Sequence, residues 1–130
     1  CKTVNIEALT MVDMAKKEIL PAVEGYAKEL SDAVIAKTTA VPGLACKYDK
    51  SVITKLSTLA DEIDTAAAAL ESAANKYKTV EDVTEASCMI RDVILQKMAE
   101  LRVVCDEAET VTAEKYWPFP TYEKLLFGVR

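Results

Sequence analysis

The sequence predicts an all-α protein, an antiparallel bundle of three long helices followed by a Trp- and Pro-rich tail. Two observations favour this class. Apolar residues recur at alternating steps of three and four over long stretches, which places them on one face of a helix. The 130 residues include 3 Gly and 4 Pro, fewer than the many turns of an all-β domain require. The length fits a single domain, which we assign to residues 1–130.

The strictest apolar pattern lies in the middle of the chain and predicts a helix over residues 50–77. Its stripe consists of Val52, Leu56, Leu59, Ile63, Ala66, Leu70, Ala73 and Tyr77. We expect Asp49 or Ser51 to cap this helix by accepting a hydrogen bond from an unpaired amide of its first turn. Because one apolar face needs partners on both flanks, this helix is expected to lie at the centre of the bundle.

A second stripe predicts the first helix, over residues 5–36. It consists of Ala8, Val12, Ala15, Ile19, Val23, Tyr26, Leu30 and Ala33. Pro21 interrupts it and removes a backbone hydrogen bond, but the stripe keeps its phase, so we expect a kink at Pro21 and no break. Residues 37–48 form the predicted loop, in which Pro42 and Gly43 mark a turn.

The third helix is predicted over residues 80–114, with Thr79 as its cap. Its stripe consists of Val83, Ala86, Ile90, Val93, Lys97, Leu101, Val104, Ala108 and Val111. Lys97 is the one charge on this line, and we expect its stem to cross the apolar seam with the amine in water. The predicted break at 78–81 contains neither Gly nor Pro, so one continuous helix over both segments is an open alternative.

The tail, residues 115–130, concentrates aromatic residues. Its two prolines end the third helix, and Thr121 can cap one further turn that Gly128 ends. A tail with this much apolar surface must dock, either on its own bundle or on another domain or subunit. The candidate docking residues are Tyr116, Trp117, Phe119, Tyr122 and Phe127.

Composition excludes several functions. A net charge of −5 argues against nucleic acid and against anionic membrane surfaces as partners. The longest purely apolar run, residues 66–70, is far too short to span a membrane. Histidine is absent, which excludes Ser/His/Asp and Cys/His catalysis and di-iron Glu-x-x-His sites, and no Gly-rich phosphate loop occurs. We therefore predict no catalytic, cofactor-binding or metal-binding residue in this chain.

Four cysteines, Cys1, Cys46, Cys88 and Cys105, show no CxxC spacing. Idle thiols of a cytoplasmic protein are favoured over a disulfide framework or a zinc site. The chain opens on Cys rather than Met, with a helical pattern already under way, so we expect it to be a piece of a longer protein.

Three strings resemble the C-terminal helical region of the type III glutamine synthetases, the large bacterial form of that enzyme. The most specific string is AEKYWPFPTY at residues 113–122, followed by LLFGV at 125–129. The others are TMVDMA at 10–15 running into ILPA at 19–22, and RDVIL at 91–95 running into MAELR at 98–102. The chain departs from the family pattern at two places. Members of the family are expected to have Gly followed by an acidic residue where this chain has Glu123 and Lys124, and often Pro where it has Gln96.

The resemblance implies a parent enzyme that ligates ammonia to glutamate with ATP cleavage and with Mg or Mn ions. Those sites lie upstream in such enzymes, so the resemblance implies a non-catalytic structural domain that packs against the rest of the parent chain and the neighbouring subunits of a homo-oligomer. A stand-alone helical bundle or coiled-coil interaction protein, supported by the apolar spacing by itself, is the alternative.

Overall fold

The computed structural model describes residues 2–117, and Phe119, Tyr122, Phe127 and the predicted last turn of the tail lie outside this range. Within this range the regular secondary structure is entirely helical, and no strand occurs. Its helices are α1 (Lys2–Met14), the π-helix η1 (Ala15–Ile19), α2 (Leu20–Ala40), α3 (Lys47–Tyr77), α4 (Val83–Met89), the π-helix η2 (Ile90–Ile94), α5 (Leu95–Val111) and the 3₁₀-helix η3 (Glu114–Tyr116). The predicted all-helical class with three long helical segments is confirmed.

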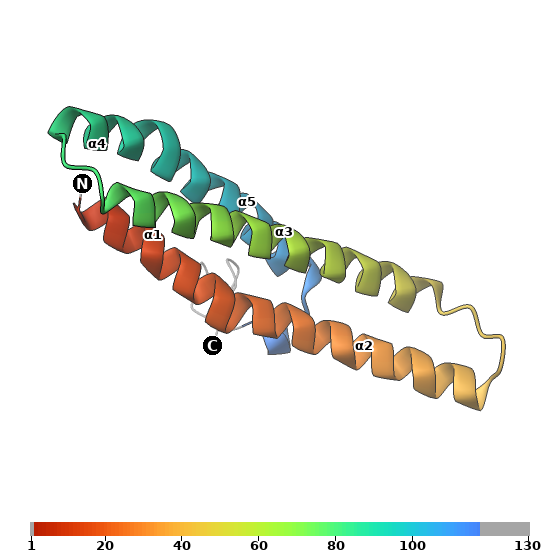
Figure 1. The fold of residues 1–130 in the computed structure, drawn as a ribbon. Coiled ribbons are helices and arrows are strands. Elements are labelled where there is room, and N and C mark those ends of the chain that lie inside the picture. The colour runs from red at the N-terminus through yellow and green to blue at the C-terminus, as the bar shows by residue number, and fades with distance from the viewer. Residues whose placement is uncertain (1, 118–130) are drawn as a thin grey trace, which may run out of the picture.

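These elements form three helical rods (Figure 1). The first rod joins α1, η1 and α2 without a break, α3 returns beside it, and α4, η2 and α5 return beside α3. Helix α3 contacts α1, α2 and α5. The hairpin of α2 and α3 extends well past the end of α5, so its far half has no third helix beside it (Figure 1).

The core forms around α3 because its apolar stripe faces the other two rods. Leu56, Ile63 and Leu70 are fully buried, and Leu59 and Ala73 are buried beside them. Each large aliphatic side chain contributes about 1.5 to 3 kcal/mol through its burial. Ala60, Ala67 and Ala74 widen the buried face, and their small side chains allow a neighbouring helix to approach closely.

The first rod is longer than the predicted range 5–36, because it continues to Ala40. The hydroxyls of Thr38 and Thr39 donate hydrogen bonds of 2.8 Å to Val34 O and 2.7 Å to Ile35 O, which keeps these polar side chains on their own helix. The rod also continues through Pro21. The wide turn of η1 precedes the proline, and the Leu20 amide donates to Ala15 O, five residues back.

The predicted cap of the middle helix is wrong. Helix α3 starts at Lys47, and its N-cap is Cys46, whose backbone lies in the left-handed region at φ 49° and which makes no side-chain cap bond. Asp49 is buried instead, where it binds the Lys37 amine. The connecting loop is accordingly residues 41–46, shorter than the predicted 37–48.

The second break is real, so the continuous-helix alternative is wrong. Asp82 caps α4 by accepting a 3.0 Å bond from the Glu85 amide, while the predicted cap, Thr79, donates its hydroxyl to Lys76 O at 2.8 Å. The helix therefore starts at Val83, later than the predicted residue 80. It ends at Val111, before the predicted residue 114, since Thr112 leaves the helical conformation at ψ 135°.

The third stripe is only partly buried in its first half, where Ile90 of the predicted line lies in the core. Ile94 is completely buried, whereas Val93 and Val83, both on the predicted line, are 37% and 80% exposed. Val83 is the first residue of α4, and Val93 lies within the π-helix η2, whose wider turn changes the directions of its side chains relative to a regular α-helix. From Leu101 to Ala108 the prediction and the structure agree again.

None of the helices described for residues 2–117 combines the length and the apolar character that a membrane crossing needs. Cys46, Cys88 and Cys105 are free, half-buried thiols. Cys1 lies outside the described residues.

Candidate functional site

The described part of the tail lies on the first rod. Helix η3 contacts α2, and Trp117 packs against the hydrophobic core. Of the five predicted docking residues, the structure thus places Tyr116 and Trp117, both half-buried, on helices of their own chain.

Tyr116 packs against the middle of α2, beside Gly25 and Tyr26. Its ring centroid is 5.7 Å from that of Tyr26, with 34° between the ring planes. This tilted geometry is typical of favourable aromatic pairs. A Cβ atom built on Gly25 would lie 3.4 Å from two ring carbons of Tyr116, so a methyl group at this position would just touch the ring.

An ion pair reinforces this contact. Lys115 Nζ is 2.9 Å from Glu29 Oε1 and 5.3 Å from the centroid of the Tyr116 ring. The hydrogen bond from Lys115 lowers the pKa of Glu29, and the same bond raises the pKa of Lys115. Both side chains are well exposed, so the pair directs the tail onto α2 more than it stabilises the fold.

Trp117 forms one wall of a small pocket of about 260 Å³. Met11, Met14 and Ile19 from the first rod line it, opposite Leu101 and Cys105 of α5. Burial, with a smaller contribution from Asp106, raises the pKa of the Cys105 thiol to about 11. Charged Arg102, Asp106 and Glu109 complete the lining of this mainly apolar pocket, and its thiol is protonated at neutral pH, so the pocket suits an apolar side chain rather than a nucleophilic reaction.

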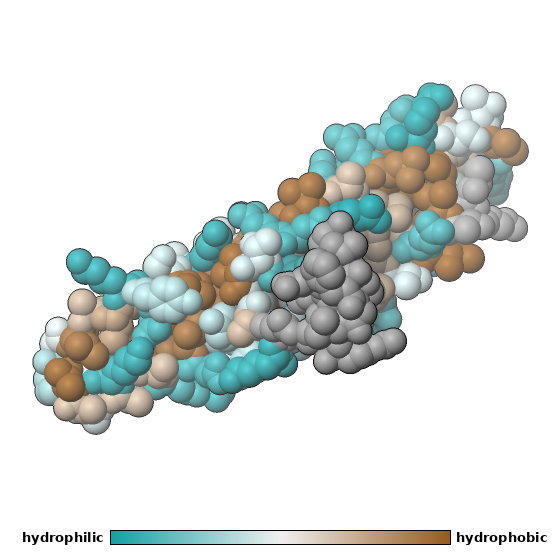
Figure 2. Space-filling view, turned by 180° about the vertical axis from the view of Figure 1, so that it is seen from behind, coloured by the Kyte–Doolittle hydropathy of each residue, from teal (hydrophilic) through white to brown (hydrophobic). Residues whose placement is uncertain are grey.

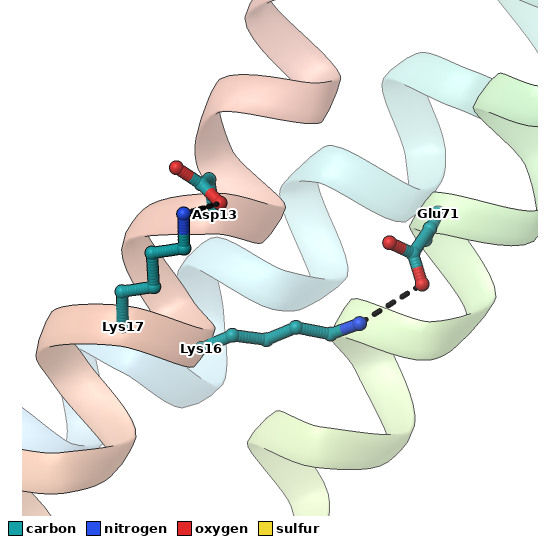
Figure 3. A network of polar contacts seen from close by, with 4 residues as sticks. All are labelled: Asp13, Lys16, Lys17 and Glu71. Carbon is teal, nitrogen blue, oxygen red and sulfur yellow. Dashed lines mark hydrogen bonds and ion pairs between the residues drawn. The ribbon is translucent and has the colours of Figure 1, made fainter.

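A second polar contact joins the first rod to α3. Lys16, in the π-helix η1, reaches Glu71 of α3 at 2.9 Å, while its neighbour Lys17 turns back to Asp13 at 3.1 Å (Figure 3). Consecutive residues of a helix point in different directions, so these two lysines bind carboxylates on different sides of the rod (Figure 3). Both pairs are exposed and contribute little to stability.

Lys97 lies where two surface grooves meet. One groove of about 470 Å³ runs between α3 and α5, and another of about 450 Å³ lies between α3 and the segment from α4 to η2. Ala69 and Lys97 line both. The Lys97 amine is 3.4 Å from Glu100, and its half-exposed side chain agrees with the predicted stem over the apolar seam.

The described part of the chain contains no group of side chains that could bind a metal ion together. Among residues 2–117, no three His, Cys, Asp or Glu side chains gather closely enough to hold an ion. Sequence reasoning missed Gly25 and Glu29 as partners of the tail, and Lys115 as the tail residue that binds Glu29. The pairing of Lys115 with Glu29 joins residues 86 positions apart, which no local pattern reveals.

Comparisons with known proteins agree with the resemblance found in the strings. Residues 1–39 match the family model of the glutamine synthetase C-terminal domain. The chain is 31% identical over 129 residues to a glutamine synthetase from Butyrivibrio fibrisolvens, an alignment that covers 99% of this chain and 18% of that protein. No solved structure shows significant similarity. The chain is thus similar along nearly its whole length to a region of a glutamine synthetase, and over its first 39 residues to the C-terminal domain of that family.

Proposed function

We propose that this chain is a non-catalytic, C-terminal structural domain of a type III glutamine synthetase. The observation that carries the proposal is the similarity to a glutamine synthetase over 99% of the chain. The tail string at 113–122 and the match of residues 1–39 support it from opposite ends of the chain. In this proposal the core around α3 makes a rigid element on which the complete enzyme is built.

The parent enzyme would be a cytoplasmic ligase that joins ammonia to glutamate, with ATP and Mg or Mn ions. The described residues do not fit such ions, since they bring no three suitable ligands together. The chain spans less than a fifth of the relative it matches, and we assign the ATP, metal and glutamate sites to the part of the enzyme beyond it. Its partners would be that catalytic part and the neighbouring subunits of a homo-oligomer.

An assay of three proteins tests this proposal: the purified chain, the complete protein encoded by its gene, and the complete protein without this region. We expect glutamate-dependent ATP turnover in the complete protein and none in the chain alone. Removal of the region should change the sedimentation coefficient by more than the lost mass explains, because an assembly element is lost. Turnover by the chain alone would show that it is catalytic.

A second candidate is a stand-alone helical interaction protein, which the self-contained core of three rods favours. The genomic sequence upstream of Cys1 separates the two. Several hundred in-frame codons that encode a catalytic domain support the glutamine synthetase domain, and a start codon close to Cys1 supports the stand-alone protein.

We also propose that the three rods form one antiparallel bundle whose first helix bends at Pro21. The π-helix η1 next to the proline supports a bend there, because both features disturb the regular hydrogen bonds of a helix. Spin labels at the exposed positions 6 and 35 can measure the bend by their separation. A longer separation in Pro21→Ala is expected, and an unchanged one would exclude a bend caused by the proline.

A further inference from the structure

The free end of the α2 and α3 hairpin exposes large apolar side chains. Ile35 and Tyr48 are 64% and 70% exposed, and Val41 and Leu44 lie exposed between them. Together with Lys47 and Lys50 they are called the tip surface. Figure 2 shows apolar and hydrophilic side chains next to one another at this end of the molecule. Exposed apolar groups gathered on a rim of charge are typical of an interaction surface.

The tip differs in charge from the rest of the chain. Residues 33–60 contain four lysines and a single acidic residue, Asp49, in a chain with 21 acidic and 16 basic residues. Asp49 is neutralised by Lys37. Lys47, Lys50 and Lys55 make no salt bridge with any other described residue and line a shallow hollow on the first turns of α3. The tip is therefore basic on an otherwise acidic protein.

The hairpin presents this surface rigidly. The 2.7 Å ion pair of Lys37 and Asp49 joins the two helices directly below the loop. The Leu44 amide donates to Val41 O at 3.2 Å and closes the turn itself. A preorganised surface loses little conformational entropy on binding.

A surface of complementary character lies farther along the hairpin, from Thr58 of α3 onward. The two neighbouring grooves that share Ala69 and Lys97 in their linings are together called the α3/α5 groove. The floor of this groove consists of small apolar side chains, Ala66, Ala69 and Val104. Five acidic and two basic side chains line it, and Asp61 and Glu62 make no salt bridge with any described residue.

We propose that the tip surface of one copy of this chain docks in the α3/α5 groove of a second copy. Exposed Ile35, Val41 and Leu44 would cover the alanine floor, and Lys47 and Lys50 would face Asp61 and Glu62. Because the two surfaces differ and lie at separate places on the rod, the contact is head to tail. Repetition of such a contact gives a closed ring or an open chain of subunits. This inference concerns the chain itself and holds whether or not the chain belongs to a glutamine synthetase.

Charge reversal at each surface, followed by sedimentation analysis of the whole chain, tests the docking. Two variants are needed, Lys47→Glu/Lys50→Glu at the tip and Asp61→Lys/Glu62→Lys in the groove. The wild-type chain should self-associate at concentrations of up to about 0.5 mM, the weak range of small interfaces. Either variant alone should lose at least about tenfold in association constant, since like charges then meet across the contact.

An equimolar mixture of the two variants gives the sharpest result. The reversed tip of one variant is complementary to the reversed groove of the other, and the remaining two surfaces are wild type, so association should return. Lys17→Glu/Lys28→Glu makes the same charge change on exposed positions outside both surfaces and should associate as the wild type does. Circular dichroism shows whether each variant is folded.

Three outcomes would overturn the proposal. These are a wild-type chain that stays monomeric over the whole concentration range, a folded tip variant that associates as strongly as the wild type, and a mixture of folded variants that stays monomeric. Association that survives salt of about 0.5 M undiminished would also contradict it, since screening weakens exposed ion pairs.

Discussion

Lys37 Nζ lies 2.7 Å from Asp49 Oδ2, and this ion pair joins the end of α2 to the first turns of α3. Asp49 is 7% exposed, so its carboxylate depends on this one amine. We expect Lys37→Met to lower the melting temperature more than the double change Lys37→Met/Asp49→Asn, because the single change leaves a buried charge without a partner. Equal melting temperatures for the two variants would contradict this.

The same pair has a pH dependence. The hydrogen bond and charge of Asp49 raise the pKa of Lys37 above 10.5. A raised pKa in the folded state stabilises the protein below the unfolded value and loses this effect as the pH rises through the folded value. The melting-temperature difference between wild type and Lys37→Met should thus shrink in alkali.

Leu70→Asp should be severely destabilising. Leu70 is fully buried on the central face of α3, and an aspartate there would bury an unpaired charge. We expect a loss of about 3 to 5 kcal/mol in the free energy of unfolding, measured by urea titration. Ala68→Asp on the exposed side of the same turn is the matched control and should cost less than about 1 kcal/mol.

Truncation of the neighbouring residues Val93 and Ile94 in the π-helix η2 should cost different amounts of stability. Ile94→Ala should cost about 2 to 5 kcal/mol, because it empties a fully buried position. Val93→Ala should cost less than about 1 kcal/mol, since Val93 is 37% exposed. The reverse order in urea titrations would contradict the burial of Ile94 and the exposure of Val93 in the folded protein.

Gly25→Ala should stabilise the protein by about 0.5 to 1 kcal/mol, because glycine is unfavourable inside a helix. The added Cβ would touch the Tyr116 ring at 3.4 Å, an ordinary contact distance. Gly25→Leu has no such room and should detach the ring, which tyrosine fluorescence or NMR of the Tyr116 ring protons can follow. A destabilised Gly25→Ala variant would show that the tail packs more tightly than described.

Cys105 should titrate with a pKa of about 11 in a variant whose other three cysteines are serine. Burial disfavours the thiolate, so this residue stabilises the fold below pH 9.0, its ordinary value, and loses that effect as the pH rises toward 11. Ultraviolet absorbance of the thiolate gives the pKa directly. The same variant in urea should titrate near 9.0.

The central helix shows how much of the fold the sequence contains. Its stripe predicted the buried face of Leu56, Leu59, Ile63 and Leu70 correctly, because a regular α-helix converts spacing directly into direction. The third helix was predicted less well. Val93, on the predicted line, is exposed, while Ile94, which lies beside that line, is completely buried, and no local pattern shows the wide turn of η2 that contains both residues.

The candidate site divides in the same way. Trp117 was selected from composition alone, since an aromatic tail needs a place to dock, and the structure puts Trp117 against the core. Its surroundings were beyond prediction. The partners of the tail on α2 are Gly25, Tyr26 and Glu29, and they meet it only because two rods lie side by side.

The sequence by itself thus determined the helical class, the three segments and the face of the central helix, because these depend on hydrogen bonds and apolar spacing within a few residues. The tertiary structure alone decided that Asp49 pairs with Lys37, that Ile94 and not Val93 is buried in the third helix, and that Tyr116 packs on α2. Each of these is set by a contact between distant segments, or by a backbone adjustment that improves such contacts, and the energy of a contact across the fold is not encoded in the residues next to it.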